Sequence, residues 1–178
     1  MARVDRASCT ATSSMAATAT KAATVYGASS IQGKNLLFAK HRLWALGNRR
    51  IFQPNLSSAS GTAQAAIYTH PDESWVYTDM AEAPQGVLFS GGNGTDSTIQ
   101  IIILDEEGGL PVLSGAITAA VMPQGETVTR IEVMAGQYIC IGTTKGVRIG
   151  LIDGPQITYG PILFECAWTN AITSWNTF

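Results

Sequence analysis

Three short apolar segments of similar composition decide the expected fold: Asn35-Leu-Leu-Phe-Ala39, Gly86-Val-Leu-Phe-Ser90 and Gln137-Tyr-Ile-Cys-Ile141. Their central residues Leu37, Leu88 and Ile139 follow one another at intervals of 51 residues. Sequence periods of 40–50 residues, with about four strands in each unit, are typical of β-propeller blades. The sequence therefore predicts an all-β, β-propeller-like domain of about three four-stranded repeats.

The rest of residues 25–178 also has the pattern of β-structure. Short apolar runs alternate with Gly, Pro, Asn and Asp, and no window shows helical periodicity. Tyr26, Tyr77 and Val128 keep the 51-residue interval and are expected in the strand before each apolar segment. We expect ten strands, at 35–39, 42–46, 49–53, 75–80, 87–90, 98–104, 127–134, 137–142, 146–152 and 156–162.

The repeats also set the expected domain organisation. Residues 1–24 are rich in Ala, Thr and Ser, and they are predicted to form an arm that is either flexible or ordered by a partner. Residues 25–178 then divide into repeats at about 25–75, 76–126 and 127–178. Propellers typically need four to eight blades to close a ring. Three repeats leave two unpaired edges, which neighbouring subunits or a longer polypeptide would have to complete.

The charge composition excludes some partners. The 178 residues include 11 Lys plus Arg and 13 Asp plus Glu, which gives a formal net charge of −2. Neither nucleic acid nor an anionic membrane is expected as a partner, because both require a basic surface. Only 13% of residues are charged, against roughly 25% in an average domain. Such a surface repels copies of itself weakly, which favours a component of an assembly.

No combination of reactive side chains points to catalysis. The two histidines, His41 and His70, have no ligand spacing, and the Gly-rich loop 90–98 lacks the Gly-Lys-Ser/Thr ending of a phosphate-binding loop. The carboxylates of Asp105-Glu-Glu107 are adjacent in a turn and point apart. The three cysteines form no metal-ligand pair: Cys9, Cys140 and Cys166. We expect no catalytic, cofactor or metal site, and a protein that is not an enzyme.

The four tryptophans allow two interpretations. Aromatic side chains pack well on half-buried pleated surfaces, so most are expected inside the sheets. Exposed tryptophans would instead form a platform for a sugar. The candidate ligand-binding aromatics are Trp44, Trp75, Trp168 and Trp175.

The segment 137–162 carries the most distinctive motif of the chain. Gly142 and Gly146 are expected to bracket a tight hairpin and to adopt positive φ, while Gly160-Pro161 ends the outer strand. The alternation along 147–151 predicts a packed face with Val147 and an Arg148 that points elsewhere. The motif residues are Gly142, Thr143, Gly146, Val147, Arg148, Tyr159, Gly160 and Pro161.

This segment resembles a blade motif of minor tail proteins of tailed phages, notably phages of actinobacteria. The stretches Thr69–Trp75 and Met122–Val128 fit the same pattern, so the resemblance covers roughly residues 35–165. It implies a structural virion protein of the tail or tail tip, which assembles with other virion proteins and with copies of itself. The alternative, which depends on exposed Trp and Tyr side chains, is a carbohydrate-binding module of a phage tail that recognises a host cell-surface glycan.

Overall fold

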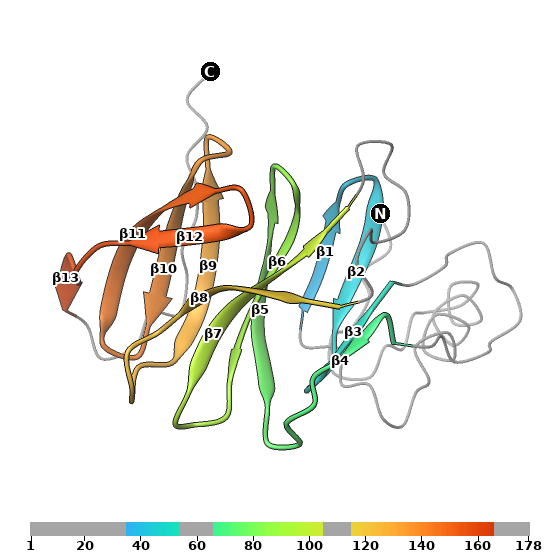
Figure 1. Ribbon diagram of the computed structural model, residues 1–178, viewed down its shortest axis with the longest axis horizontal. Helices are drawn as coiled ribbons and strands as arrows, with labels where there is room; N and C mark the ends of the chain where they lie inside the picture. Colours follow the sequence, from blue (N-terminus) through green and yellow to red (C-terminus); the bar gives the residue numbers. More distant parts are fainter. Residues whose placement is uncertain (1–34, 54–65, 105–114, 166–178) are drawn as a thin grey trace, which may run out of the picture.

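The computed structural model describes residues 35–53, 66–104 and 115–165, and these form three antiparallel β-sheets (Figure 1). The described residues contain no helix, and therefore none with the length and apolarity needed to cross a membrane. The expected all-β class is confirmed.

Each sheet is built from strands that are consecutive along the chain. The first sheet contains β1 (Asn35–Ala39), β2 (Arg42–Leu46), β3 (Arg50–Phe52) and β4 (Tyr68–Thr69). The second sheet contains β5 (Val76–Ala83), β6 (Gly86–Gly92), β7 (Ser97–Ile103) and β8 (Ile117–Val121). The third sheet contains β9 (Val128–Met134), β10 (Tyr138–Thr143), β11 (Gly146–Asp153), β12 (Gln156–Tyr159) and β13 (Phe164–Glu165).

All ten expected strands are present, but three further strands were not anticipated: β4, β8 and β13. β4 and β13 have two residues each, which is too short for an alternating pattern. β8 has the sequence Ile-Thr-Ala-Ala-Val, and alanine is depleted in strands. The third sheet therefore has five strands instead of the expected four.

The 51-residue period brings Leu88 and Ile139 to the second strands of their sheets, but not to equivalent positions, because the two side chains face each other across the space between the second and third sheets and so lie on opposite faces. Leu88 and Ile139 lie in β6 and β10, each the second strand of its sheet along the chain, and Tyr77 and Val128 lie in the preceding strands β5 and β9. Leu37 lies in β1, the first described strand of its sheet, and Tyr26, expected in the strand before it, lies outside the described residues. The strands of the first sheet are shorter than those of the second, and β1 begins only 41 residues before β5, whereas β5 begins 52 residues before β9.

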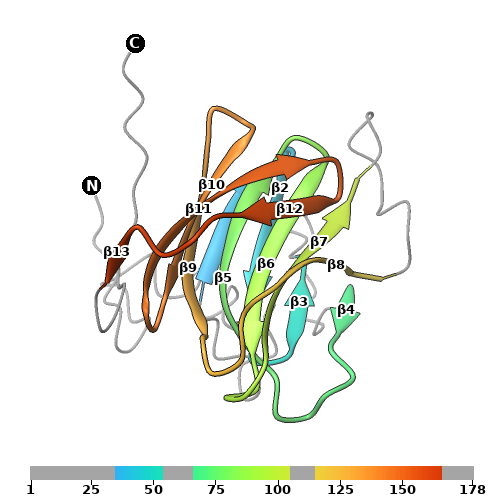
Figure 2. The same cartoon turned by 60° about the vertical axis from the view of Figure 1, so that its left-hand side comes forward.

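The three sheets stand in a row and pack face to face (Figures 1 and 2). β5 contacts both β1 of the first sheet and β9 of the third, while β8 contacts β12. The second sheet is therefore covered on both faces. The buried residues of β7, with Ile99, Ile101 and Ile102 almost inaccessible, confirm that this strand is enclosed on two sides.

Two apolar clusters fill the spaces between the sheets. Between the first and second sheets, Trp44 and Leu46 pack with Tyr77, Val87 and Phe89. A second cluster joins the second sheet to the third, and its members include Leu88, Ile99, Ile101, Ile131, Ile139 and Ile141. Successive side chains of a strand point to opposite faces, so each strand of the second sheet contributes to both clusters.

Candidate functional site

The hairpin between β10 and β11 brings the predicted motif residues together. The Thr143 hydroxyl accepts hydrogen bonds from the backbone N–H groups of Lys145 and Gly146, which fixes the turn. Gly146 has φ of 151°, and a Cβ at this position would lie 2.2 Å from the Phe164 carbonyl oxygen. Gly142 does not adopt the expected positive φ; it lies within β10, paired with Arg130 and Val147.

A buried ion pair holds this hairpin to the connection before β9. Arg148 Nε and Nη2 each donate to Glu126, to Oε1 and Oε2 respectively, both at 2.8 Å. Glu126 is only 1% exposed, and its Oε1 also accepts a hydrogen bond from Thr143 at 2.7 Å. The hydrogen bonds from Arg148 hold the pKa of Glu126 below its ordinary range and raise the pKa of Arg148.

Arg148 also joins the hairpin to the last strands of the sheet. Its Nη1 donates to the Gly160 carbonyl at 2.8 Å, and its guanidinium lies 5.4 Å from the centre of the Tyr159 ring. β12 ends at Tyr159 as expected, because Pro161 has no backbone N–H to continue the ladder. The motif residues therefore form a structural joint between the hairpin, the connection before β9 and the end of β12.

The face of β11 that is turned toward the second sheet is the opposite of the one expected from the alternation. Arg148 pairs with Ile141 and faces the second sheet, where it is engaged by Glu126. Val147, Ile149 and Leu151 face away from the second sheet. Sequence alternation identifies two faces of a strand, but the buried ion pair decides here which face is turned inward.

Asp79 of β5 connects all three sheets. Its Oδ1 accepts a hydrogen bond from Asn35 of β1, and its Oδ2 accepts one from the Ile131 N–H of β9 at 3.0 Å. Arg130 Nη1 lies 4.0 Å from the same carboxylate. Burial raises the pKa of Asp79, against the opposing effect of these hydrogen bonds. Asp79 thus fixes how the first and third sheets are placed on the second.

Two tryptophans proposed as ligand-binding aromatics lie in the interior. Trp44 and Trp75 are buried, Trp44 packs edge-on against Phe89, and His70 stacks on Trp75 at 4.1 Å between ring centres. Neither tryptophan offers a surface to a sugar ring in this structure. Trp168 and Trp175 lie outside the described residues.

The described residues contain no group of three or more His, Cys, Asp or Glu side chains that could hold a metal ion. His70 Nδ1 accepts a hydrogen bond from the Asp72 backbone N–H, and burial lowers the pKa of His70. Asp72 in turn has a pKa lowered to about 2 by hydrogen bonds from Ser74 and Asn93. These contacts hold the turn at Asp72 against the ring of Trp75 and against the β6–β7 loop.

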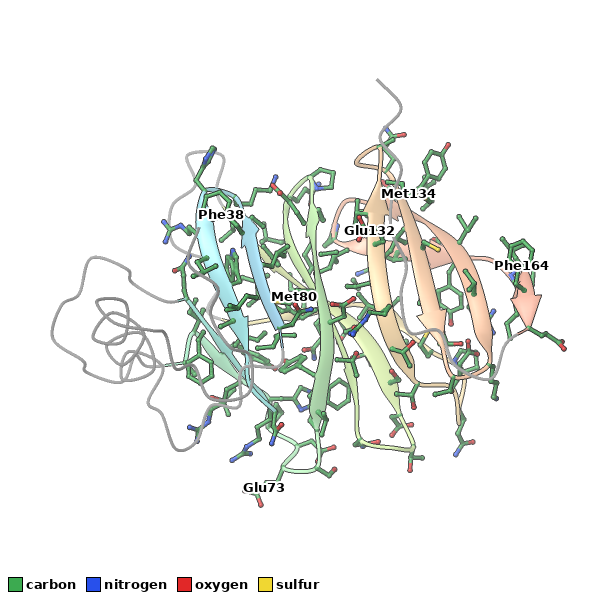
Figure 3. All side chains as sticks on the ribbon, turned by 180° about the vertical axis from the view of Figure 1, so that it is seen from behind. Phe38, Glu73, Met80, Glu132, Met134 and Phe164 are labelled. Carbon is green, nitrogen blue, oxygen red and sulfur yellow. The ribbon has the colours of Figure 1, made fainter. Side chains whose placement is uncertain are left out.

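Exposed apolar side chains at the ends of the row of sheets are the remaining candidate for function. The outer face of the third sheet is the side turned away from the second sheet. Its apolar members are Met134, Tyr138, Cys140, Val147, Ile149, Leu151 and Phe164. Tyr138, Ile149, Leu151 and Phe164 are 49, 41, 46 and 70% exposed. Met134 and Phe164 are labelled in Figure 3.

The opposite end has a smaller surface of the same kind. On the outer face of the first sheet, Leu36 and Phe38 of β1 are 57% and 70% exposed. Ala45 and Phe52 share that face, through the pairs Leu36–Ala45 and Ala45–Phe52, and are only 0% and 5% exposed. Figure 3 shows Phe38 and Phe164 at opposite ends of the molecule. Exposed apolar residues gathered on one face mark interaction surfaces. The third sheet therefore presents the larger open apolar face, and the first sheet an exposed patch at Leu36 and Phe38.

Sequence reasoning missed the residues that join the sheets. Glu126 and Asp79 were not singled out, although each is an acidic residue beside or within an apolar strand. Acidic residues are almost never fully buried without a partner. An acidic residue next to or inside an apolar strand was therefore the one sequence signal that could have indicated a buried ion pair or hydrogen bond. The partners Arg148 and Asn35 are far away along the chain, and only the folded chain identifies them.

Comparison with known proteins adds no relative. No protein-family model matches the chain, and no curated protein matches its sequence.

Proposed function

We propose that this chain is a non-enzymatic structural module, a propeller-like row of sheets that assembles with further sheets in a phage virion, in the tail or tail tip. The observation that carries the structural role is the apolar outer face of the third sheet. The placement in a virion rests on the resemblance of residues 142–148 and 159–161 to the blade motif of phage minor tail proteins.

The second sheet shows how an apolar sheet face is buried when another sheet packs against it. Its side toward the third sheet carries Leu88, Ile99 and Ile101, which are 0, 0 and 1% exposed because the third sheet covers them. The outer face of the third sheet presents Cys140, Val147 and Ile149 in the corresponding strands β10 and β11. A fourth sheet packed there would remove these side chains from water, a contribution of about 25 cal/mol for each Å² of apolar surface.

Low charge supports the same role. A surface with 13% charged residues and a net charge of −2 repels neighbouring subunits weakly. We expected assembly through strand edges and the N-terminal arm. Residues 1–24 lie outside the described residues, and the two ends of the row offer sheet faces as well as strand edges. Assembly through faces is therefore the form of the proposal that the described residues favour.

Purified native particles test the proposal. Mass spectrometry is expected to find the chain in the tail, and the double variant Phe38→Asp/Ile149→Asp should be incorporated at least about tenfold less than the wild type. Val121→Asp is the matched control, because Val121 is 59% exposed but lies on β8, away from both end faces. Absence of the chain from particles, or normal incorporation of the double variant, would contradict the proposal.

The carbohydrate-binding alternative now depends on Trp168 and Trp175, because Trp44 and Trp75 are buried. A glycan array with the purified chain distinguishes the two roles. Saturable binding that is lost in the Trp168→Ala/Trp175→Ala variant would favour the glycan-binding role over a purely structural one. The structural proposal predicts no such binding.

A further inference from the structure

We propose, beyond the assembly role and independently of it, that Asn93 is a modification site. It converts spontaneously to aspartate and isoaspartate, and the conversion releases the turn at residues 72–74 from the β6–β7 loop. Asn93 lies in that Gly-rich loop, where it is half-buried and the following Gly94 is exposed. The chain has six asparagines, and Asn93 alone is followed by a glycine, which has no side chain to hinder a reaction at its amide nitrogen.

The conversion begins when the Gly94 amide nitrogen attacks Cγ of Asn93. The new C–N bond closes a succinimide ring and the bond from Cγ to Nδ2 breaks, so that Nδ2 leaves as ammonia with the proton from the Gly94 nitrogen. Water then opens the ring. Cleavage at Cγ gives aspartate, and cleavage at the backbone carbonyl carbon gives isoaspartate, in which the chain runs through the side chain. The net change consumes one water and releases one ammonia.

The geometry of the loop favours this attack. Asn93 Oδ1 accepts hydrogen bonds from the backbone N–H groups of Thr95 and Asp96, at 3.0 and 2.8 Å. Negative charge develops on this oxygen when Cγ is attacked, so the two donors stabilise the intermediate as an oxyanion hole does. Gly94 has φ of 95°, and a Cβ built on it would meet no atom within 4 Å. Within the described ranges, no group accepts a hydrogen bond from the Gly94 N–H, which is therefore free to lose its proton.

Asn93 also holds the neighbouring turn in place. Its Nδ2 donates to Asp72 Oδ2 at 2.9 Å, while Asp72 Oδ1 accepts hydrogen bonds from the Ser74 N–H and hydroxyl. The Asp72 N–H donates to His70, whose ring stacks on Trp75 with an interplanar angle of 14°. The Asn93 amide thus connects the β6–β7 loop to the turn that carries the stacked rings. Figure 3 shows this turn, marked by Glu73, at the edge of the molecule.

Conversion replaces an attraction between these two side chains by a repulsion. The new carboxylate at position 93 has no N–H to donate, and it faces the carboxylate of Asp72 at the distance of a hydrogen bond. Both groups are ionised at neutral pH, and like charges at this distance repel. The new carboxylate still accepts hydrogen bonds from Thr95 and Asp96, so the loop keeps its own turn while the contact with Asp72 is lost.

Incubation of the purified full-length chain at mildly alkaline pH tests the modification, because base removes the amide proton. Mass spectrometry of the digested chain is expected to show the change from amide to acid at Asn93, and labelling with an isoaspartyl methyltransferase should detect the isoaspartate. Asn48, which is exposed in the β2–β3 turn but followed by Arg49, is the internal control and should convert at least about tenfold more slowly. Equal rates at the two sites, or no conversion at Asn93, would overturn the proposal.

The variant Asn93→Asp tests the release of the turn. The stacked Trp75 ring shifts the proton resonances of the His70 ring, and NMR measures this shift. Asn93→Asp should reduce it, while the exposed His41 serves as the reference in the same spectrum. A His70 shift equal to that of the wild type would show that the Asn93 amide does not hold the turn, and the release would be disproved.

Two further variants separate the lost hydrogen bond from the added charge. Thr95→Asp is the matched control, because it adds the same charge at an exposed position of the same loop but keeps the Asn93 amide. Its His70 shift should equal that of the wild type. Asp72→Asn/Asn93→Asp exchanges the donor and the acceptor, so it should restore the shift that Asn93→Asp loses. A loss of the shift in Thr95→Asp, or no recovery in the double variant, would contradict the release mechanism.

Discussion

The side of the second sheet toward the third sheet and the outer side of the third sheet resemble each other in sequence and differ in their surroundings. On the second sheet, Leu88 and Ile101 are 0% and 1% exposed, while on the third sheet Ile149 and Leu151 remain more than two-fifths exposed. Both pairs lie in interior strands of an antiparallel sheet. The difference shows that the apolar face of a strand becomes part of the core only where a neighbouring sheet covers it.

The largest effect is expected at the ion pair on the covered side of the third sheet. Glu126→Gln should lower the free energy of unfolding by roughly 3–5 kcal/mol, because it leaves the charge of Arg148 buried without its partner. Chemical denaturation at neutral pH measures this loss. Glu82→Gln, at the more exposed Lys40–Glu82 pair with 3.6 Å between the charged atoms, is the matched control and should cost less than about 1 kcal/mol.

The same variant predicts a pH dependence. Arg148 lowers the pKa of Glu126 in the folded chain, so the folded state favours the carboxylate. The resulting stability is present above the ordinary glutamate pKa and is lost as the pH falls through the lowered value. The difference in unfolding free energy between wild type and Glu126→Gln should therefore shrink on acidification. A difference that stays constant down to pH 3 would show that the charge of Glu126 is not what stabilises the joint.

A matched pair of truncations examines the covered and uncovered faces directly. Ile101→Ala should cost about 3 kcal/mol, because it opens a cavity between the second and third sheets. Ile149→Ala removes the same atoms from the outer face and should cost less than about 1 kcal/mol in the dilute monomer. Denaturant unfolding of both variants provides the comparison. Equal losses would mean that the outer face is already covered in the monomer.

The smallest effect concerns the outermost strands of the two sheets. The Tyr159 hydroxyl donates to the Val121 carbonyl at 2.6 Å and so joins β12 to β8. Tyr159→Phe should lower the unfolding free energy by about 1 kcal/mol, the net value of one hydrogen bond. Tyr138→Phe on the outer face serves as the control, with an expected change within about 0.5 kcal/mol. A reversed order of the two effects would contradict the contact between β8 and β12.

The fold class and most strands could be predicted because local patterns carry them. Turn residues such as Gly47-Asn48 and Asp153-Gly154 connect β2 to β3 and β11 to β12. The 51-residue period did not place Leu37 in a strand equivalent to β6, because the strands of the first sheet are short and β1 begins only 41 residues before β5, whereas β5 begins 52 residues before β9. β8 was not anticipated although Ile117, Thr118 and Val121 are β-branched, because two alanines interrupt the run of strand-forming residues.

The motif around Gly142, Arg148 and Tyr159 could be found from the sequence, while its role could not. Arg148 was expected to point away from the packed face, and it lies instead on the covered side against Glu126. The prediction failed because an arginine is ordinarily solvated, and only a partner brought close by the fold makes its burial favourable. For the same reason the role of Asp79 could not be predicted, because Asn35 and Ile131 meet at its carboxylate only in the folded chain.

The sequence by itself determined that this chain forms β-strands, where most of them begin and end, and that its surface is poor in charge. These properties follow from alternation, turn residues and composition, which act over a few neighbouring residues. The tertiary structure decided which face of each strand is covered, which charges are paired and which apolar faces remain open. Those outcomes depend on contacts between residues far apart in the chain, such as Asp79 with Ile131, and no local pattern specifies them.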